Sequence, residues 1–246
     1  MTFGPIFGIL FQKQFRNLGA FAASVRALPT MITKYGYDVF FTITGVCLAA
    51  IVISLLFVEP RFLKYGIIAL ALLFFGFTLN FFRDPERTTP TGDSLVVSPA
   101  DGKVIVVKNV EELEFFKGPA LQISIFMSPL NVHVNRIPIS GVVSHFRYVK
   151  GEYFAAFVDK ASEKNEQTII GLENHTGKVL FKQIAGFVAR RIVCELQVGD
   201  TVRIGERFGM IKFGSRVDVF LPPNAAAKVT VGENAAAGET ILAQLP

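Results

Sequence analysis

One dipeptide near the C-terminus, Gly214-Ser215, has the residue types for a reaction of the chain on itself. A serine hydroxyl held in a tight turn can attack the preceding carbonyl, which converts the amide into an ester. β-Elimination then cuts the chain and leaves a pyruvoyl group, whose carbonyl can act as an electron sink in catalysis. A Gly-Ser pair is also an ordinary turn sequence. The dipeptide alone leaves both interpretations open.

Two other segments hold side chains suited to acid–base chemistry. His133 lies in a polar, proline-bounded run, SPLNVHVNRIP at 128–138. Imidazole titrates near neutral pH, so His133 can transfer a proton, although a turn histidine bonded to its own backbone fits the same sequence. Asp101, in SPADG at 98–102, is either a β-turn former or a carboxylate that orients a neighbouring histidine.

Histidine and cysteine are too scarce for the usual metal sites. His133, His145 and His175 include no pair at helical spacing, so neither zinc nor iron has an evident ligand set. We expect His145 to face solvent and His175 to occupy a hairpin turn. Cys47 and Cys194 fall in different parts of the chain, which excludes a disulfide framework and is compatible with a reducing cytoplasm. No glycine-rich loop opens a helix, so nucleotide chemistry has no evident site.

Two apolar runs indicate a membrane anchor. The chain is 51% apolar with a mean hydropathy of +0.44. The excess lies in Val39–Val58 and Tyr65–Phe82, which hold no charged residue and are joined only by Glu59–Lys64. As a helix, each run is long enough to cross a hydrocarbon core of about 30 Å. We therefore expect a transmembrane helical hairpin over residues 39–82, with a buried core hairpin or a re-entrant pair as alternatives.

The basic charge belongs to this membrane part. Residues 1–82 carry six Lys or Arg against two Asp or Glu, so +4 of the net +5 lies there rather than on a nucleic-acid-binding face. Residues 1–38 mix apolar and basic side chains, which predicts a basic interfacial segment instead of a cleaved signal peptide. The cations that flank the hairpin favour a cell-membrane protein with its following domain on the cytoplasmic side.

Residues 83–246 have the pattern of one mostly β domain. Short runs rich in Val, Ile and Phe alternate with turn residues, and several show the period-two alternation of half-buried strands. Turns such as 98–103 resemble those of the barrel-sandwich folds of lipoyl and biotinyl carrier domains. We expect a barrel-sandwich-like soluble domain behind the two-helix hairpin, with strands at 104–107, 121–126, 141–149, 168–174, 178–186, 190–196 and 216–222.

Three motifs follow the hydrophobic region in order: SPADG at 98–102, FMSPLNVHVNRIPISG at 126–141 and FGSRVDVFLP at 213–222. Together they resemble the phosphatidylserine decarboxylase family, most closely its short, proteobacterial and archaeal type. The resemblance covers roughly residues 80–246, and the Gly-Ser motif with its following strand is the most specific part. It favours the pyruvoyl interpretation of Gly214-Ser215 over the plain turn.

The resemblance implies self-cleavage between Gly214 and Ser215. Residues 1–214 would become the β chain, residues 215–246 the α chain, and Ser215 the covalent pyruvoyl cofactor. The implied reaction converts phosphatidylserine to phosphatidylethanolamine and CO2 through a Schiff base between the substrate amine and the pyruvoyl carbonyl. The archaeal ether lipid archaetidylserine has the same headgroup and would undergo the same chemistry. A non-catalytic, membrane-tethered β domain that binds a lipid headgroup or a partner is the alternative from another class.

The family's site residues carry over only in part. Asp101 matches the acidic member of the self-cleavage triad, and His133 matches the first of two paired histidines, which is linked to decarboxylation. Long-type members have their second histidine where this chain has Arg136, and they read Leu-Gly-Ser-Thr where it reads Phe213–Arg216. The family's Asp–His–Ser relay for self-cleavage therefore cannot be assigned in full to this chain. Either His133 serves both steps, which we favour, or another group activates Ser215.

Two further residues are candidates for substrate binding. Arg136 suits a phosphate or a carboxylate, and a structural ion pair is equally compatible with its sequence position. Asn135 lies beside it. The expected partners are the phospholipid and the membrane, without nucleic acid or metal. A homo-oligomer is also compatible with the sequence.

Overall fold

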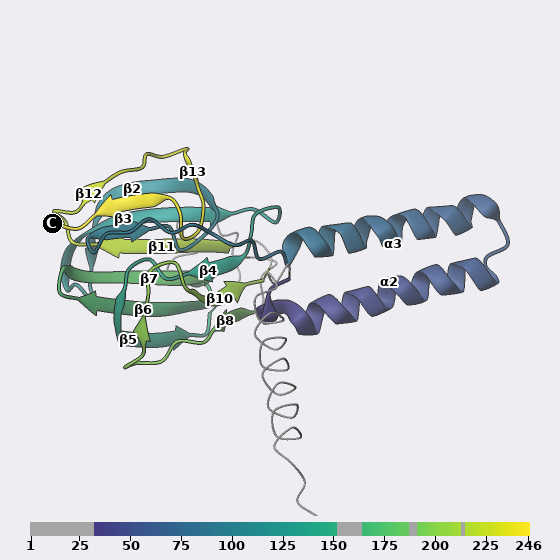
Figure 1. Cartoon of the computed structure of the whole chain (residues 1–246), viewed down its shortest axis with the longest axis horizontal. Coiled ribbons are helices and arrows are strands. Elements are labelled where there is room, and N and C mark those ends of the chain that lie inside the picture. The colour runs from purple at the N-terminus through teal and green to yellow at the C-terminus, as the bar shows by residue number, and fades with distance from the viewer. Residues whose placement is uncertain (1–31, 152–163, 187–190, 213–214) are drawn as a thin grey trace, which may run out of the picture. The chain divides into compact units, whose positions relative to one another are not determined.

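The computed structural model describes residues 32–151, 164–186, 191–212 and 215–246 (Figure 1). Most of the expected interfacial segment, residues 1–31, lies outside them, as does Gly214. The end of that segment, from Ile32 on, is described and contacts the rest of the chain. Ile32 forms a β-bridge with Arg83, Lys34–Gly36 forms the 3-10 helix η1, and the side chain of Tyr35 is buried.

The two apolar runs form two helices, α2 (Tyr37–Phe57) and α3 (Arg61–Phe81). The connection between them is shorter than the expected linker Glu59–Lys64, because the N–H of Lys64 already bonds the Pro60 carbonyl. The φ of Pro60, −64°, is close to the helical value, so the chain can enter a helix immediately after it.

Both helices expose their apolar side chains. Only 17% of the apolar stretch of α2 and 11% of that of α3 are buried within the described part of the chain. Large side chains such as Phe57 and Phe62 are 75% and 83% exposed. A core hairpin would bury these faces against protein, so this alternative is wrong for the described residues. Both helices are long and apolar enough to cross a membrane.

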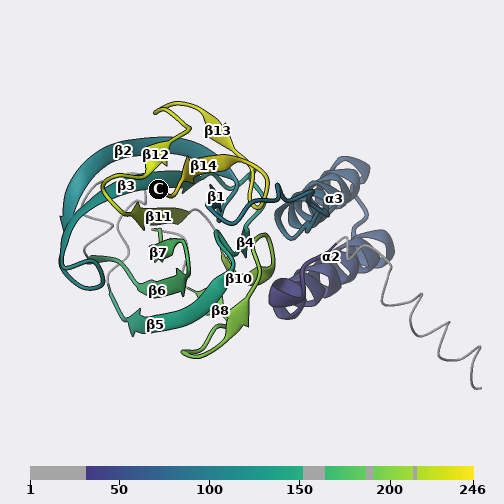
Figure 2. The same ribbon diagram turned by 60° about the vertical axis from the view of Figure 1, so that its left-hand side comes forward.

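The rest of the described chain is mainly β, which confirms the expected fold class. Figure 2 shows the main sheet curling around the core. Every pairing in it is antiparallel. In spatial order, its strands are β13 (Asn234–Ala235), β2 (Gly102–Glu112), β3 (Gly118–Met127), β11 (Ser215–Leu221), β7 (Gly177–Ala185), β6 (Gln167–Asn174), β5 (Gly141–Val149) and β9 (Thr201–Val202).

Two three-stranded sheets complete the domain. One contains β1 (Leu95–Val97), β14 (Ile241–Gln244) and β12 (Ala226–Ala227), and the other contains β4 (Val134–Arg136), β10 (Arg207–Ile211) and β8 (Ile192–Cys194). Each of the seven expected strands overlaps an observed one.

The pairing of β10 requires a glycine. Gly209 lies opposite Asn135 on one side and Cys194 on the other. A Cβ at Gly209 would lie 2.1 Å from the carbonyl oxygen of Val193. The close approach of these three strands therefore depends on the missing side chain. It brings the segment after His133 alongside the strand that leads to the expected cleavage point.

One apolar cluster joins the base of the hairpin to this small sheet. Its members come from η1, the end of α3, and β4 and β10 with their flanks. The buried ones are Tyr35, Phe81, Phe82, Val132, Val134 and Met210. The hairpin is thus packed against the strands that carry the candidate site, and Figure 1 shows β4, β8 and β10 at this end of the domain.

Candidate active site

The three sequence motifs meet at two atoms, the sulfur of Met127 and the carbonyl oxygen of Pro99. The Ser215 hydroxyl donates to the Met127 sulfur at 3.1 Å. The Asn135 amide nitrogen lies 3.9 Å from the same sulfur and 3.3 Å from the Pro99 oxygen. The backbone N–H of Arg136 also donates to that oxygen, at 3.0 Å. SPADG, the polar run and the cleavage strand therefore form one neighbourhood.

Strand alternation aims the Ser215 side chain into the core. Ser215 is the first residue of β11, opposite Met127 on β3 and Ala185 on β7. Alternate residues of a strand share a face, so Ser215 lies on the side of Val217 and Val219, which belong to the main apolar core. The residue is fully buried. Its hydroxyl is thus held out of water, on a weak acceptor, at the end of a central strand.

His133 is buried with one nitrogen satisfied and the other free. Its Nδ1 lies 2.9 Å from the Asn131 carbonyl oxygen. A carbonyl can only accept, so Nδ1 carries the proton and Nε2 has a lone pair in the neutral ring. That Nε2 is buried and has no hydrogen-bond partner within the described residues. An unpaired polar atom inside a protein is costly and marks a place where a reacting group is expected.

Burial also sets the charge of His133. The pKa of the ring is lowered from 6.5 to about 4, mainly by burial and also by the nearby Arg83 charge, while the bond to the Asn131 carbonyl opposes the shift. The ring is therefore neutral at pH 7. The sequence analysis expected an ordinary, near-neutral pKa for His133. That expectation is wrong, because the burial that lowers the pKa arises from packing between distant segments. In the described state His133 is a proton acceptor.

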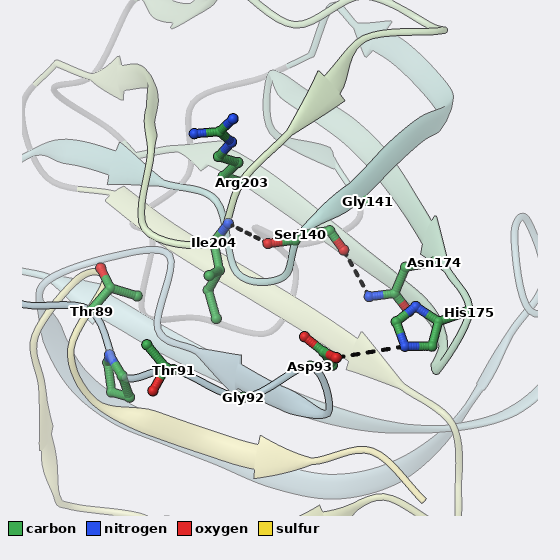
Figure 3. A pocket seen from close by; sticks show the side chains of 11 residues that line it. Thr89, Thr91, Gly92, Asp93, Ser140, Gly141, Asn174, His175, Arg203 and Ile204 are labelled. Carbon is green, nitrogen blue, oxygen red and sulfur yellow. Dashed lines mark hydrogen bonds and ion pairs between the residues drawn. The ribbon is translucent and has the colours of Figure 1, made fainter.

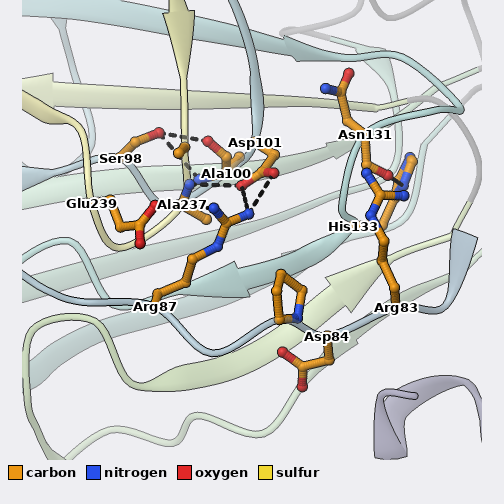
Figure 4. A network of polar contacts seen from close by, with 12 residues as sticks. Arg83, Asp84, Arg87, Ser98, Ala100, Asp101, Asn131, His133, Ala237 and Glu239 are labelled. Carbon is orange, nitrogen blue, oxygen red and sulfur yellow. Dashed lines mark hydrogen bonds and ion pairs between the residues drawn. The ribbon is translucent and has the colours of Figure 1, made fainter. Parts of the chain in front are cut away.

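Asp101 is held by Arg87, one of the cations that follow the second apolar run in the sequence. Arg87 donates to both Asp101 oxygens, at 3.1 and 2.8 Å, and to Glu239 at 3.0 Å (Figure 4). The N–H of Ala237 adds a bond of 2.7 Å to Asp101. The Arg87 and Asp101 side chains are only 16% and 13% exposed. Within the part of the chain that the structure describes, Asp101 bonds neither His133 nor Ser215, so the acid–base relay is not assembled.

Arg136 and Asn135 point to opposite sides of β4, as alternation requires. The Arg136 guanidinium donates to the carbonyls of Gly205 and Pro85, each at 2.9 Å, and lies 3.5 Å from Asp84. Its side chain is 6% exposed. Of the two alternatives for Arg136, this geometry is that of the structural ion pair.

Asn135, by contrast, turns toward Met127, the residue that the Ser215 hydroxyl contacts. It is fixed there by two residues that the sequence analysis missed. Gln183 donates to the Asn135 side-chain oxygen at 2.9 Å, and Thr168 donates to Gln183 at 2.7 Å. Thr168 and Gln183 lie in expected strands, at positions whose side chains share a face with apolar neighbours. A polar residue on the inner face of each strand was therefore the sequence signal that could have found them. The chain of bonds aims the Asn135 N–H groups at Met127 and Pro99.

The two remaining histidines lie elsewhere. His175 occupies the β6–β7 turn, as expected, and lies 3.8 Å from Asp93. Both line a cavity of about 550 Å³ (Figure 3), and none of Ser215, His133 or Asp101 does. The expectation that His145 faces solvent is wrong. Its Nε2 is 2.9 Å from a Glu114 oxygen, and its side chain is 30% exposed, because the segment after β2 folds over β5.

Comparison with known proteins identifies the family. The model of the family "Phosphatidylserine decarboxylase" matches residues 74–243. A "Phosphatidylserine decarboxylase proenzyme" of Chlorobium chlorochromatii is 49% identical over 212 residues, which are 86% of this chain and 99% of the relative. Proteins of the same description from Pelodictyon phaeoclathratiforme and Desulfotalea psychrophila are 46% and 50% identical, over 87% and 71% of this chain and 100% and 82% of their own lengths. The matched range contains all three motifs, and this chain therefore belongs to the phosphatidylserine decarboxylase family of carboxy-lyases.

Proposed function

We propose that the chain cuts itself between Gly214 and Ser215 and then decarboxylates phosphatidylserine to phosphatidylethanolamine with the pyruvoyl group so formed. Family membership supports the decarboxylation and sets aside the non-catalytic alternative. The observation that carries the self-processing is the meeting of Ser215, Asn135 and Pro99 around Met127, inside the protein. The relatives named above are proenzymes, in keeping with a cut precursor.

The surroundings of Ser215 fit a pyruvoyl group. The residue begins β11, where it pairs with Met127 and Ala185. A break just before it therefore falls at the end of the two ladders and keeps their pairing intact. Its full burial keeps bulk water from a reactive carbonyl. A pyruvoyl group supplies a carbonyl that condenses with the substrate amine and accepts the electron pair released as CO2 leaves.

The proposed cut consists of three balanced changes. The Ser215 oxygen bonds to the Gly214 carbonyl carbon as the peptide C–N bond breaks, and the hydroxyl proton is passed to the released amine. Loss of the proton on Cα of residue 215 then expels the Gly214 carboxylate with the C–O bonding electrons. Finally the resulting enamine, CH2=C(NH2), takes a proton on Cβ and becomes an imine, and water adds to the imine carbon as ammonia leaves, which gives the pyruvoyl C=O. The first change needs a base close to the Ser215 hydroxyl.

His133 is the proposed base, and it also serves in turnover. Its buried Nε2 has a lone pair at pH 7 and no partner in the described chain, so it can accept the hydroxyl proton without breaking another bond. The N–H of Ile211, four residues before Ser215, donates to the His133 carbonyl at 3.4 Å, which ties the two segments. In turnover, Nε2 would carry the proton that the substrate carbon takes up after CO2 leaves. Its low pKa makes the protonated ring a strong donor.

Asp101 has a supporting role in this proposal. Its carboxylate, with Arg87 and the Ala237 N–H, fixes the turn whose Pro99 carbonyl receives Asn135. It therefore positions the neighbourhood of Ser215 rather than taking a proton.

The two chains would stay together after the cut. Residues 215–246 contribute β11, which lies between β3 and β7, and also β13, β12 and β14, which pair within two sheets. Pulling the fragment out would break all of these ladders. The exposed hairpin would hold this assembly at the membrane, and the flanking cations favour the cytoplasmic side.

Denaturing electrophoresis with mass analysis tests the proposal. We expect two fragments, residues 1–214 and 215–246, the smaller with a pyruvoyl terminus. Ser215→Ala should give one uncut, inactive chain. Ser144→Ala is the control, because Ser144 is an exposed serine of β5 whose hydroxyl donates to the Gly171 carbonyl at 3.5 Å, away from the proposed cleavage point. Active protein that runs as one full-length chain, or a small fragment that begins with an ordinary serine, would overturn the proposal.

A further inference from the structure

One arginine lies where the chain leaves the apolar helix α3. The helix ends at Phe81, and Arg83 follows two residues later. The backbone is fixed at this point, because Phe82 accepts the Thr33 N–H at 2.8 Å and Arg83 forms a β-bridge with Ile32. If α3 spans the hydrocarbon core, Arg83 lies at its boundary. The phosphates of a bilayer lie at the same level, just outside the hydrocarbon.

The side chain of Arg83 lies beside His133. One terminal nitrogen donates to the Leu130 carbonyl at 2.9 Å, and His133 Nδ1 bonds the next carbonyl along the chain, that of Asn131, at 2.9 Å. The other terminal nitrogen donates to the Asn80 carbonyl. Figure 4 shows the Arg83 side chain extending toward the imidazole. Neighbouring carbonyls of one turn thus hold a cation and the candidate proton carrier together.

Arg83 has no acidic partner in the described part of the chain. Every other buried or half-buried arginine there forms an ion pair: Arg87, Arg136, Arg207 and Arg216. Arg83 bonds two neutral carbonyls instead, which leaves N–H groups of its guanidinium unused. Burial lowers its pKa, as expected for a partly desolvated cation whose charge is not matched at contact distance.

We propose that Arg83 binds the phosphodiester of the phospholipid substrate, beside His133. The inference rests on the proposed function, since it places the headgroup at the same site. It assigns the phosphate rather than the carboxylate because the carboxylate must lose its charge as CO2 leaves. An arginine paired with it would stabilise the ground state more than the transition state. The phosphate keeps its charge throughout, and a planar guanidinium suits it.

The test compares Arg83→Gln and Arg83→Lys with Arg61→Gln. Arg61 begins the same helix at its other end, is exposed and forms no ion pair with the described residues, so it is a matched control for charge. With soluble short-chain phosphatidylserine in detergent, Arg83→Gln should raise KM about tenfold or more with kcat changed less, as for loss of a charge-assisted bond. Arg83→Lys should recover part of the loss, and Arg61→Gln should match the wild type. An unchanged KM in Arg83→Gln overturns the proposal.

A second readout does not depend on activity. In the uncut Ser215→Ala background, binding of short-chain phosphatidylethanolamine is measured with and without Arg83→Gln. This product has the phosphate and no carboxylate, so weaker binding supports phosphate recognition, and equal binding overturns it. The readout also applies if Arg83→Gln blocks processing. Gel analysis separates the two ideas: an uncut but active wild type refutes self-processing, whereas normal cutting with wild-type KM and product binding in Arg83→Gln refutes only the role of Arg83.

Discussion

The imidazole of His133 stacks on the phenyl ring of Phe81, with ring centroids 4.2 Å apart and planes inclined by 30°. Phe81 is the last residue of α3. The ring that covers the proposed proton carrier therefore belongs to the hairpin that we expect in the membrane. Because burial is the main cause of the low pKa of His133, the hairpin contributes to the chemistry of the site as well as to its location.

Removal of the Phe81 ring should therefore raise the pKa of His133. In Phe81→Ala water gains access to the imidazole, and we expect a rise of about one unit or more from about 4 toward 6.5. Titration of the histidine C–H resonance by NMR measures it directly. Phe74→Ala is the matched control on the same helix, since Phe74 is 54% exposed. An unchanged titration in Phe81→Ala would show that other groups keep the ring dry.

The same pKa predicts how stability depends on pH. His133 binds a proton below about pH 4 when folded and below about 6.5 when unfolded. Between these pH values the unfolded chain binds more protons than the folded chain. The contribution of neutral His133 to the unfolding free energy is therefore present in full above pH 6.5 and is lost as pH falls toward 4. The loss is at most about 3 kcal/mol.

Denaturant titrations in detergent at pH 7 and pH 4.5 measure this dependence. His133→Gln should remove the part of the pH dependence that His133 contributes, because the amide does not titrate. His145→Gln is the control and should leave the His133 contribution unchanged, since His145 bonds Glu114 whereas His133 bonds the Asn131 carbonyl. A pH dependence that persists unchanged in His133→Gln would assign it to the carboxylates instead.

The sequence predicted the elements better than the contacts between them. Period-two alternation located β5, β6 and β11 closely, and charge-free length located α2 and α3. These signals are local, because each element must present an apolar face wherever it packs. The meeting of SPADG with the segment of His133 followed from the resemblance, and no spacing could have predicted it.

The missed contacts depend on packing between distant segments. Arg87 and Asp101 pair only because the membrane exit crosses the SPADG turn. Arg136 faces Asp84, and Asn135 faces Met127, because residues alternate along β4 and Gly209 lets β10 pair closely with it. Such orientations are properties of the assembled sheets and leave no mark at any single position.

The pair of Arg87 and Asp101 should show strong energetic coupling. Both side chains are mostly buried, so Arg87→Gln leaves a carboxylate without its cation, and we expect a loss of about 3 kcal/mol in unfolding free energy. In Arg87→Gln/Asp101→Asn much of the loss should be recovered. A double-mutant cycle measures the coupling.

The control cycle uses Arg147 and Glu114, whose side chains are 52% and 22% exposed. For this pair we expect less coupling, about 1 kcal/mol or below. Equal coupling in the two cycles would contradict the structural role of the Arg87–Asp101 pair.

A buried lysine links α2 to the cleavage segment, and this contact should affect the rate of processing. Lys212 lies two residues before Gly214, its side chain is 5% exposed, and its ammonium is 3.0 Å from an Asp38 oxygen in the first turn of α2. Asp38→Asn leaves that ammonium buried without its anion, so the segment before Ser215 should loosen and self-cleavage should slow.

Pulse labelling with gel analysis of the precursor measures this rate. Asp38→Asn/Lys212→Met should restore most of it, because the double variant has no unpaired buried charge and Met keeps the length of the apolar stem. Lys34→Met is the control, since its pair with Glu195 is 60% and 50% exposed and so contributes little. If Asp38→Asn cuts at the wild-type rate, or if the double variant is slower than the single one, the Lys212–Asp38 contact does not position the cleavage segment.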